Sequence, residues 1–357
     1  MFLISAENFL DECLKNVEGE IATAPEDERF LAIDTEFIRE NQEKPLLCLI
    51  QIAAPATVHL IDPMEMDISQ LNQFFANPKI RKVFHSASQD LEILSLYGVE
   101  TKNYYDTQLY ESVLSVDASI SYQSIVTRYL DINLRKDHSL SDWKRRPLSK
   151  NQLQYSTDDV LYLREVYKKQ FCKLRNCNRT DWLDDELKNL ANIGVNSGEG
   201  NGGIYQQLDA WRCQRAAIEN VSPRSIVGNG MLKDVSRKGV DFVRRLKYSR
   251  NIRNENFRKF LSFAEKITEG LEISEKHSER SAVFVLLKTL LEISSLEHGV
   301  AASVIAQSGD LEELIRGNDS VKCATGWRME LFGRWAIKLL NGEVSLGVGD
   351  RTRVLIE

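Results

Sequence analysis

Four acidic side chains are the residues of this sequence whose types and spacing could do chemistry. Asp34 and Glu36 follow an apolar run, and Asp90 and Asp159 come 56 and then 69 residues further along. Carboxylates gathered from distant segments repel and raise one another's pKa values, a conflict that divalent cations resolve. Their oxygens are hard ligands that suit magnesium or manganese rather than zinc. The pattern therefore predicts a two-metal site for phosphodiester hydrolysis.

The local structure around the first three acids favours a shared site. Asp34 and Glu36 are two positions apart on an expected strand, so both side chains leave the same face. Asp90 falls in the first turn of an expected helix, where a negative charge also suits the helix dipole. An acidic pair on a strand and an acid near a helix start are each common without catalysis. The prediction therefore depends on their order and spacing together.

The fourth acid is expected on a long helix that begins near Ser149, where Ser149–Gln152 forms a capping box. Tyr155 and Asp159 are four positions apart and share one face of that helix. Asp158 points about 100° away, so Asp159 is the expected ligand and Asp158 is expected to be exposed. With a reference pKa near 10, Tyr155 is better suited to position a water than to act as a base. Its structural alternative is a core tyrosine.

Apolar patterns around these residues predict an α/β segment. The segment 30–61 has the spacing of an antiparallel meander. A helix after Ser5 would place Phe9, Leu10, Cys13, Leu14 and Val17 on one face. After residue 203 the patterns predict only helices, in groups at 204–273 and 278–346. The expected strands are 1–4, 30–37, 46–53, 57–61 and 80–85, and the expected helices before residue 203 include 68–75, 89–97, 107–115, 122–130 and 149–175.

Composition describes an ordinary soluble globular chain. The 357 residues are 43% hydrophobic and 27% charged, and no segment has the apolar length of a membrane span. The first residues lack the basic region of a signal peptide. Six scattered cysteines without a C-x-x-C pair indicate a reducing compartment. The expected location is the cytoplasm, with no membrane association and no evident protein partner.

Glycine content and charge divide the chain. Residues 194–203 contain five glycines and are expected to form a flexible linker. The segment 204–260 holds 13 Lys and Arg against 5 Asp and Glu, whereas the first 193 residues carry a net charge of about −9. The predicted units are a nuclease domain at 1–193, the linker at 194–203, and helical domains at 204–275 and 276–357. The basic unit is expected to attract phosphates.

Several segments together resemble the ribonuclease D family, in the Tyr-containing subclass of the DnaQ-like DEDD exonucleases. The resemblance implies an α/β nuclease domain of the RNase H-like type, with a mixed sheet flanked by helices, followed by two all-α HRDC-type domains. The matching segments are Asp34-Thr35-Glu36-Phe37, Leu49-Ile50-Gln51, His85 to Glu92, Asp106-Thr107, Asp142-Trp143 with Arg146-Pro147-Leu148, Tyr155 with Asp159-Val160, Gln207 to Arg212, and Gly326 to Gly333.

The same resemblance implies the activity and the catalytic residues. Its metal ligands correspond to Asp34, Glu36, Asp90 and Asp159, and its orienting tyrosine to Tyr155, with two Mg²⁺ or Mn²⁺ ions as cofactors. The implied activity is 3′→5′ exoribonucleolytic release of nucleoside 5′-monophosphates, in 3′ processing of tRNA precursors and other structured RNAs with free 3′ ends. A DNA 3′→5′ exonuclease and a non-catalytic RNA-binding module are the alternatives.

Candidate substrate contacts are less specific. His85 is a substrate contact or a structural strand-end histidine, and Phe37 is a wedge beneath the terminal base or a core residue. Two alternatives are expected for Trp143, Arg145 and Arg146. They contact RNA by stacking on a base and holding a phosphate, or they fix a loop. Asp106 and Asp142 are expected to accept hydrogen bonds within loops rather than to bind metal. The basic helical segment contributes Arg237, Lys238, Arg244 and Arg245, as RNA contacts or as a solvated face.

The linker and the charge asymmetry also suggest a way to divide the molecule. A chain ending near Ile193 is expected to keep cleavage of short single-stranded RNA. It is expected to lose affinity for tRNA-like substrates, because the basic helical unit is gone.

Overall fold

The computed structural model describes residues 2–5, 7–38, 45–64, 66–134, 141–183, 204–219, 223–245, 255–268, 282–348 and 354–356. The predicted linker at 194–203 lies outside these residues. Among the described residues, no helix combines the length and apolar character needed to cross a bilayer.

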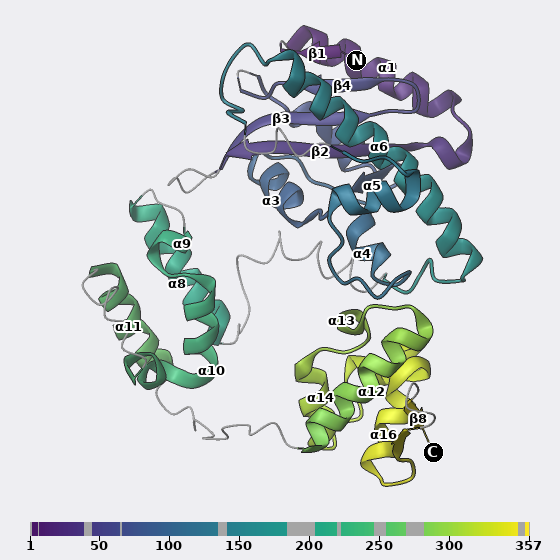
Figure 1. Ribbon diagram of the computed structural model, residues 1–357. Coiled ribbons are helices and arrows are strands. Elements are labelled where there is room, and N and C mark those ends of the chain that lie inside the picture. Colours follow the sequence, from purple (N-terminus) through teal and green to yellow (C-terminus); the bar gives the residue numbers. More distant parts are fainter. Residues whose placement is uncertain are drawn as a thin grey trace.

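A six-stranded mixed sheet organises the first part of the chain, in the order β1-β4-β3-β2-β5-β6 (Figure 1). The predicted antiparallel meander is confirmed, because β3 pairs antiparallel with both β2 and β4. The pairs β1·β4, β2·β5 and β5·β6 are parallel. The edge strand β6 was not predicted, because three residues give too short a pattern. The strands are β1 Phe2–Ile4, β2 Phe30–Ile38, β3 Leu46–Ala53, β4 Val58–Ile61, β5 Arg81–Phe84 and β6 Tyr104–Asp106.

Side chains alternate between the two faces of the sheet, and helices cover both faces. Leu31 and Ile33 pack into one core together with residues of α1 and α3. Phe30 and Ala32 pack into a second core beneath α6, which contacts β2, β3, β4 and β5. Because Asp34 and Glu36 continue the even-numbered series of β2, they stand on the α6 face. The helices here are α1 Glu7–Thr23, α2 Asn72–Phe75, α3 Ser88–Leu96, α4 Thr107–Glu111, α5 Tyr122–Leu130 and α6 Lys150–Asn176, with 3-10 turns η1 Glu26–Glu28 and η2 Ser69–Leu71.

The long helix α6 begins as predicted and is fixed to the sheet at one point by a buried cation. The Ser149 side chain and Gln152 form the predicted capping box. Further along α6, the guanidinium of buried Arg164 donates to the carbonyl oxygen of Phe30 at 2.9 Å and pairs with Glu28. These contacts hold α6 over the strand that carries Asp34.

Two helical modules follow. The first helical module, α8 to α11, has a hydrophobic cluster of its own. The second helical module, α12 to α16, is followed by the strands β7 and β8, which pair antiparallel, so the prediction of helices alone was wrong for these short strands. The first module consists of α8 Ile204–Glu219, α9 Pro223–Ile226, α10 Asn229–Arg245 and α11 Glu255–Thr268; the second consists of α12 Ala282–His298, α13 Ala302–Ile305, α14 Ser308–Ile315, η3 Lys322–Ala324, α15 Gly326–Arg328, η4 (a π-helix) Met329–Gly333, α16 Arg334–Leu340, β7 Leu346–Val348 and β8 Val354–Ile356.

The second helical module shares its core with the α/β domain formed by residues 2–183. Buried Val113 and Leu183 belong to the same hydrophobic cluster as Leu287 and Leu290 of α12. The backbone N–H of Ala301 also donates to the carbonyl oxygen of Ser112 at 2.7 Å. A chain ending near residue 193 would expose the side of this core that belongs to residues 2–183, and its expected cleavage of short single-stranded RNA stays a prediction.

One side chain on α1 was also placed on the wrong face. Leu10, Cys13, Leu14 and Val17 are buried as expected, but Phe9 is 59% exposed. Phe9 precedes Leu10 by one position, which is 100° around the helix, and so lies at the margin of the apolar stripe.

Candidate active site

Three of the four predicted acids come together on the α6 face of the sheet. Asp34 and Glu36 project from β2 and Asp159 projects from α6, and one ligand atom of each lies within 4.8 Å of the others. The register of β2 against β3 shifts between Glu36 and Phe37. Such a bulge bends the strand and often re-aims side chains near active sites. A cluster of this kind has the hard oxygen donors that Mg²⁺ and Mn²⁺ prefer.

Asp90 stands beside this cluster in the first turn of α3. Its buried carboxylate accepts a hydrogen bond from the hydroxyl of Thr35. Asp90 is not among the three acids that share the 4.8 Å group. Its negative charge nevertheless contributes to the raised pKa of Glu36. The four acids therefore form one electrostatic unit, with Asp90 held at its side by Thr35.

Burial and mutual repulsion disfavour the charged form of these acids. Burial raises the pKa of Asp34 to about 6. Burial and the charge of Asp34 raise the pKa of Asp159 to about 8, and burial with the charges of Asp34, Asp159 and Asp90 raises that of Glu36 to about 10. Burial first, and then the charge of Asp34, raises the pKa of Asp90 well above its usual value. Divalent cations would return all four groups to the ionised state that ligands require.

Tyr155 lies one turn before Asp159 on α6, and the two side chains share a hydrogen bond. Burial and the charge of Asp159 raise the pKa of Tyr155 well above its ordinary value. The phenol is therefore a protonated donor at neutral pH. This agrees with a role in holding an oxygen atom and argues against a role as a base.

Asp106 builds the turn that carries Asp90 to the site. Its buried carboxylate accepts from the backbone N–H groups of Ser86 and Ala87, each at 2.9 Å. It also accepts from the N–H groups at the start of α4. Ser86 has a φ of 61°, a left-handed conformation that these hydrogen bonds stabilise. The prediction of a loop-fixing acceptor is confirmed for Asp106, and also for Asp142, which accepts from the N–H of Lys144 at 3.1 Å.

Two predicted substrate contacts are instead parts of the scaffold. Trp143 is 2% exposed and packs at 6.1 Å between ring centroids from Tyr155, so its ring offers no face to a nucleotide base. Arg146 pairs with Asp62 and donates to the carbonyl oxygens of Trp143 and Cys48 at 2.7 and 2.8 Å. The loop-fixing alternative is therefore the one that the structure supports for both residues.

The other candidate contacts lie in different surroundings. The ring nitrogens of His85 lie 2.9 Å from the Thr107 hydroxyl and 3.1 Å from the Ile120 carbonyl oxygen, as a structural histidine would. Phe37 is half-buried against the α1–α3 core, and Arg145 is exposed. Arg237, Lys238, Arg244 and Arg245 are carried by α10, and their side chains lie outside the described residues.

Two residues of the site were missed by the sequence reasoning. Thr35, between the two acids of β2, holds Asp90. Tyr122 on α5 donates its hydroxyl to the carbonyl oxygen of Asp159 and so ties α5 to the turn of α6 that carries Asp159. The only sequence feature that pointed to Thr35 was its position between Asp34 and Glu36. No sequence feature pointed to Tyr122.

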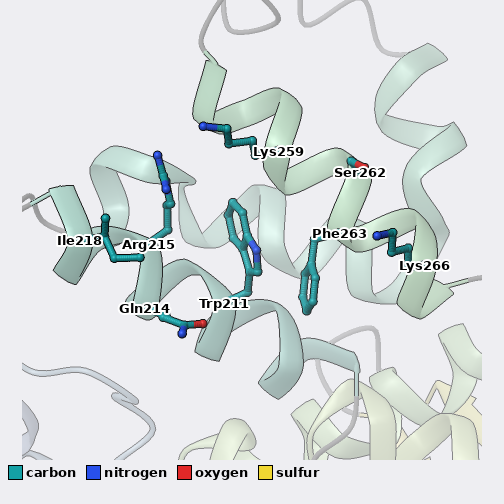
Figure 2. Close-up of a pocket in the computed structure, with 8 residues that line it drawn as sticks. All are labelled: Trp211, Gln214, Arg215, Ile218, Lys259, Ser262, Phe263 and Lys266. Atoms are coloured by element: carbon teal, nitrogen blue, oxygen red, sulfur yellow. The ribbon is translucent and has the colours of Figure 1, made fainter.

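A separate groove lies between α8 and α11 of the first helical module. Figure 2 shows Trp211 and Phe263 at its centre, with Lys259 and Lys266 projecting from α11. The two aromatic rings stack with centroids 5.7 Å apart. The groove has a volume of about 430 Å³, and each charged side chain that lines it is basic: Arg215, Lys259 and Lys266.

The sheet, the helix that crosses it and the acidic cluster define a 3′-5′ exonuclease fold. The family model described as 3′-5′ exonuclease matches residues 10–173. This match covers every residue of the acidic cluster, together with Asp90 and Tyr155.

Relatives over nearly the full length narrow this class. Ribonuclease D of Bartonella henselae is 37% identical over 88% of this chain and 86% of its own length, and that of Zymomonas mobilis is 33% identical over 92% and 93%. The chain belongs to the ribonuclease D family and is an exoribonuclease. The crystal structure of Escherichia coli RNase D, described as an exoribonuclease involved in structured RNA processing, has a TM-score of 0.68, covers 96% of this chain and 98% of its own, and is 23% identical. At that identity, the likeness supports the fold.

Proposed function

We propose that this exoribonuclease removes nucleoside 5′-monophosphates one at a time from the 3′ end of structured RNAs, tRNA precursors among them, with two divalent ions. The observation that carries the proposal is the cluster of Asp34, Glu36 and Asp159, with Asp90 at its side. Four acids whose pKa values are raised by burial and by one another are stable as ligands only when cations offset their charge. Mg²⁺ and Mn²⁺ fit this donor set.

The side chains of the site have different proposed roles. Asp34, Glu36, Asp159 and Asp90 would hold the ions. Two bound ions supply an activated water and neutralise the charge that develops on the leaving 3′ oxygen. The hydroxyl of Tyr155, a protonated donor next to Asp159, orients the attacking water. Thr35 and Asp106 keep Asp90 in place through the hydrogen bonds described above.

The first helical module is proposed to act as an HRDC-type RNA-binding domain, and its groove supports this role. Bases stack on aromatic side chains regardless of sequence, for about 1–3 kcal/mol per base, and Trp211 with Phe263 provides such a surface. Lys259 pairs with Glu255 on the exposed side of α11. Exposed pairs contribute about 0–1 kcal/mol, so a phosphate can replace Glu255 at little cost.

A comparison of neighbouring acids tests the proposed chemistry. Asp159→Asn should reduce hydrolysis of a 5′-labelled RNA by several orders of magnitude. Asp158→Asn should leave most activity, because Asp158 bonds to the exposed side chain of Gln154 instead. Equal losses in both variants would contradict the assignment, as would activity that survives exhaustive chelation by EDTA. Matched RNA and DNA oligonucleotides separate the exoribonuclease from the alternative DNA exonuclease.

The proposed RNA groove has its own test in an Asp159→Asn background, where RNA is bound and not cleaved. Lys266→Ala should weaken binding of a tRNA-like RNA and reduce the salt dependence, by a slope of about 0.7 if one single-strand phosphate contact is lost. Lys233→Ala removes the same charge from an exposed position on α10 and serves as the control. Equal effects of the two changes would show general attraction without use of the groove.

A further inference from the structure

Gln51 is a buried amide next to the acidic cluster, and the chemistry described so far gives it no role. It lies on the central strand β3, directly opposite Asp34 of β2 and Leu60 of β4. Side chains directly opposite each other in an antiparallel pair stand on the same face, with Cβ atoms about 4.5–5.5 Å apart. The side chain of Gln51 therefore stands beside Asp34 beneath α6, where its exposure is 0%.

Neither polar atom of this side chain has a hydrogen-bond partner among the described residues. The same is true of the Ser156 hydroxyl and of Oδ2 of Asp159, both on the helix that covers this face. A buried polar group without a partner costs about 1–3 kcal/mol. Methionine has a similar length and would fill the position of Gln51 without that cost, so packing alone does not account for an amide here. A buried group of this kind calls for an explanation, such as a role in the site or a bound water or ion.

We propose that Gln51 is a positioning residue of the metal centre. Its amide N–H donates through one water to the carboxylate of Asp34 and holds that carboxylate in the orientation in which it takes a divalent ion. Carboxylates that bind metals are themselves hydrogen-bonded, and loss of such an outer partner typically costs 10–100-fold in metal affinity. An amide is suited to this task because it donates a hydrogen bond without adding charge to the cluster. The inference rests on the proposed metal-dependent function.

Binding of Mn²⁺ alone, measured by calorimetry without RNA, tests the proposal. Gln51→Met should weaken Mn²⁺ binding about 10–100-fold and leave the melting temperature in EDTA unchanged or higher, because an unsatisfied amide is removed. Gln170→Met is the matched control. Gln170 is equally buried but bonds to Tyr105, Thr107 and Glu111, so its loss should lower the melting temperature and leave Mn²⁺ affinity unchanged.

The outcomes separate this inference from the function on which it rests. Wild-type affinity for Mn²⁺ in Gln51→Met would overturn the role of Gln51 alone. A lower melting temperature with unchanged affinity would do the same and would make Gln51 a structural residue. Absence of Mn²⁺ binding by the wild-type protein would overturn the metal-dependent function, and this inference with it. Gln51→Leu, which is shorter, gives the same comparison if the methionine does not fit.

Discussion

Trp327 should be a main point of attachment between the second helical module and the nuclease domain. Its ring stacks on that of Trp182 with centroids 4.3 Å apart and an interplanar angle of 7°. Its indole N–H donates to the carbonyl oxygen of Trp182 at 2.8 Å. The guanidinium groups of Arg179 and Arg328 lie over the outer faces of the two rings, at 4.8 and 4.1 Å. The ring stacking and the indole hydrogen bond join a segment near residue 180 to one near residue 327, and each guanidinium packs on the ring of its own segment.

The cost of Trp327→Ala follows from these contacts. An aromatic pair contributes about 0.5–1.5 kcal/mol beyond its buried area, and the hydrogen bond adds about 0.5–1.5 kcal/mol. Fully buried tryptophan truncations cost about 3–5 kcal/mol, and Trp327 is half-buried, so we expect about 3 kcal/mol. For a unit of this size that corresponds to a decrease in melting temperature of about 6–12 °C. Trp327→Phe keeps a stacked ring and should cost only about 1 kcal/mol.

Calorimetry measures the decrease in melting temperature, and residual nuclease activity after heating follows the unfolding of the nuclease domain. Because the nuclease domain and the second helical module share a core, both signals should shift together in Trp327→Ala. Trp211→Ala, the same change in the separate core of the first helical module, should leave the loss of nuclease activity at its wild-type temperature. The reasoning is refuted if Trp327→Ala melts the second helical module alone and leaves the nuclease transition unmoved.

Three further predictions concern the site and the core. Tyr155→Phe should raise the barrier to hydrolysis by about 2–4 kcal/mol with Mn²⁺ binding retained, which single-turnover kinetics would show. Gly333→Ala should destabilise by about 1–3 kcal/mol in urea titrations, because the new Cβ would lie 2.6 Å from a backbone oxygen, whereas Gly309→Ala meets nothing within 4 Å and should not. In EDTA, the melting temperature should fall as pH rises from 5 to 9. The clustered acids have folded-state pKa values of about 6, 8 and 10, above their unfolded values near 4, so the folded state holds more protons across this range. A flat profile would contradict the strong coupling of these acids, and saturating Mn²⁺ should remove the slope.

The sequence by itself predicted most of the helices and strands and the acids of the cluster. Alternation along β2 placed Asp34 and Glu36 on one face, and helical spacing placed Tyr155 with Asp159. These are local properties with periods of two and 3.6 residues, so they can be read without knowing what packs on them. The capping box at Ser149 and the acceptor role of Asp106 were predictable for the same reason, since short polar side chains bond to nearby backbone.

Only the tertiary structure decided which residues support those acids. Thr35 and Tyr122 bond to residues 55 and 37 positions away, Gln51 lies opposite a residue of the neighbouring strand, and nothing in their local pattern points to a partner. Trp143 and Arg146 had a sequence context equally suited to RNA binding and to loop packing. The burial of Trp143 and the internal hydrogen bonds of Arg146 favour packing. The sequence also did not predict that the second helical module packs on the nuclease domain. An apolar helix face predicts burial but does not identify the surface that covers it. Which distant segments contact each other depends on the complete fold, and the periodicity of the sequence does not reveal it.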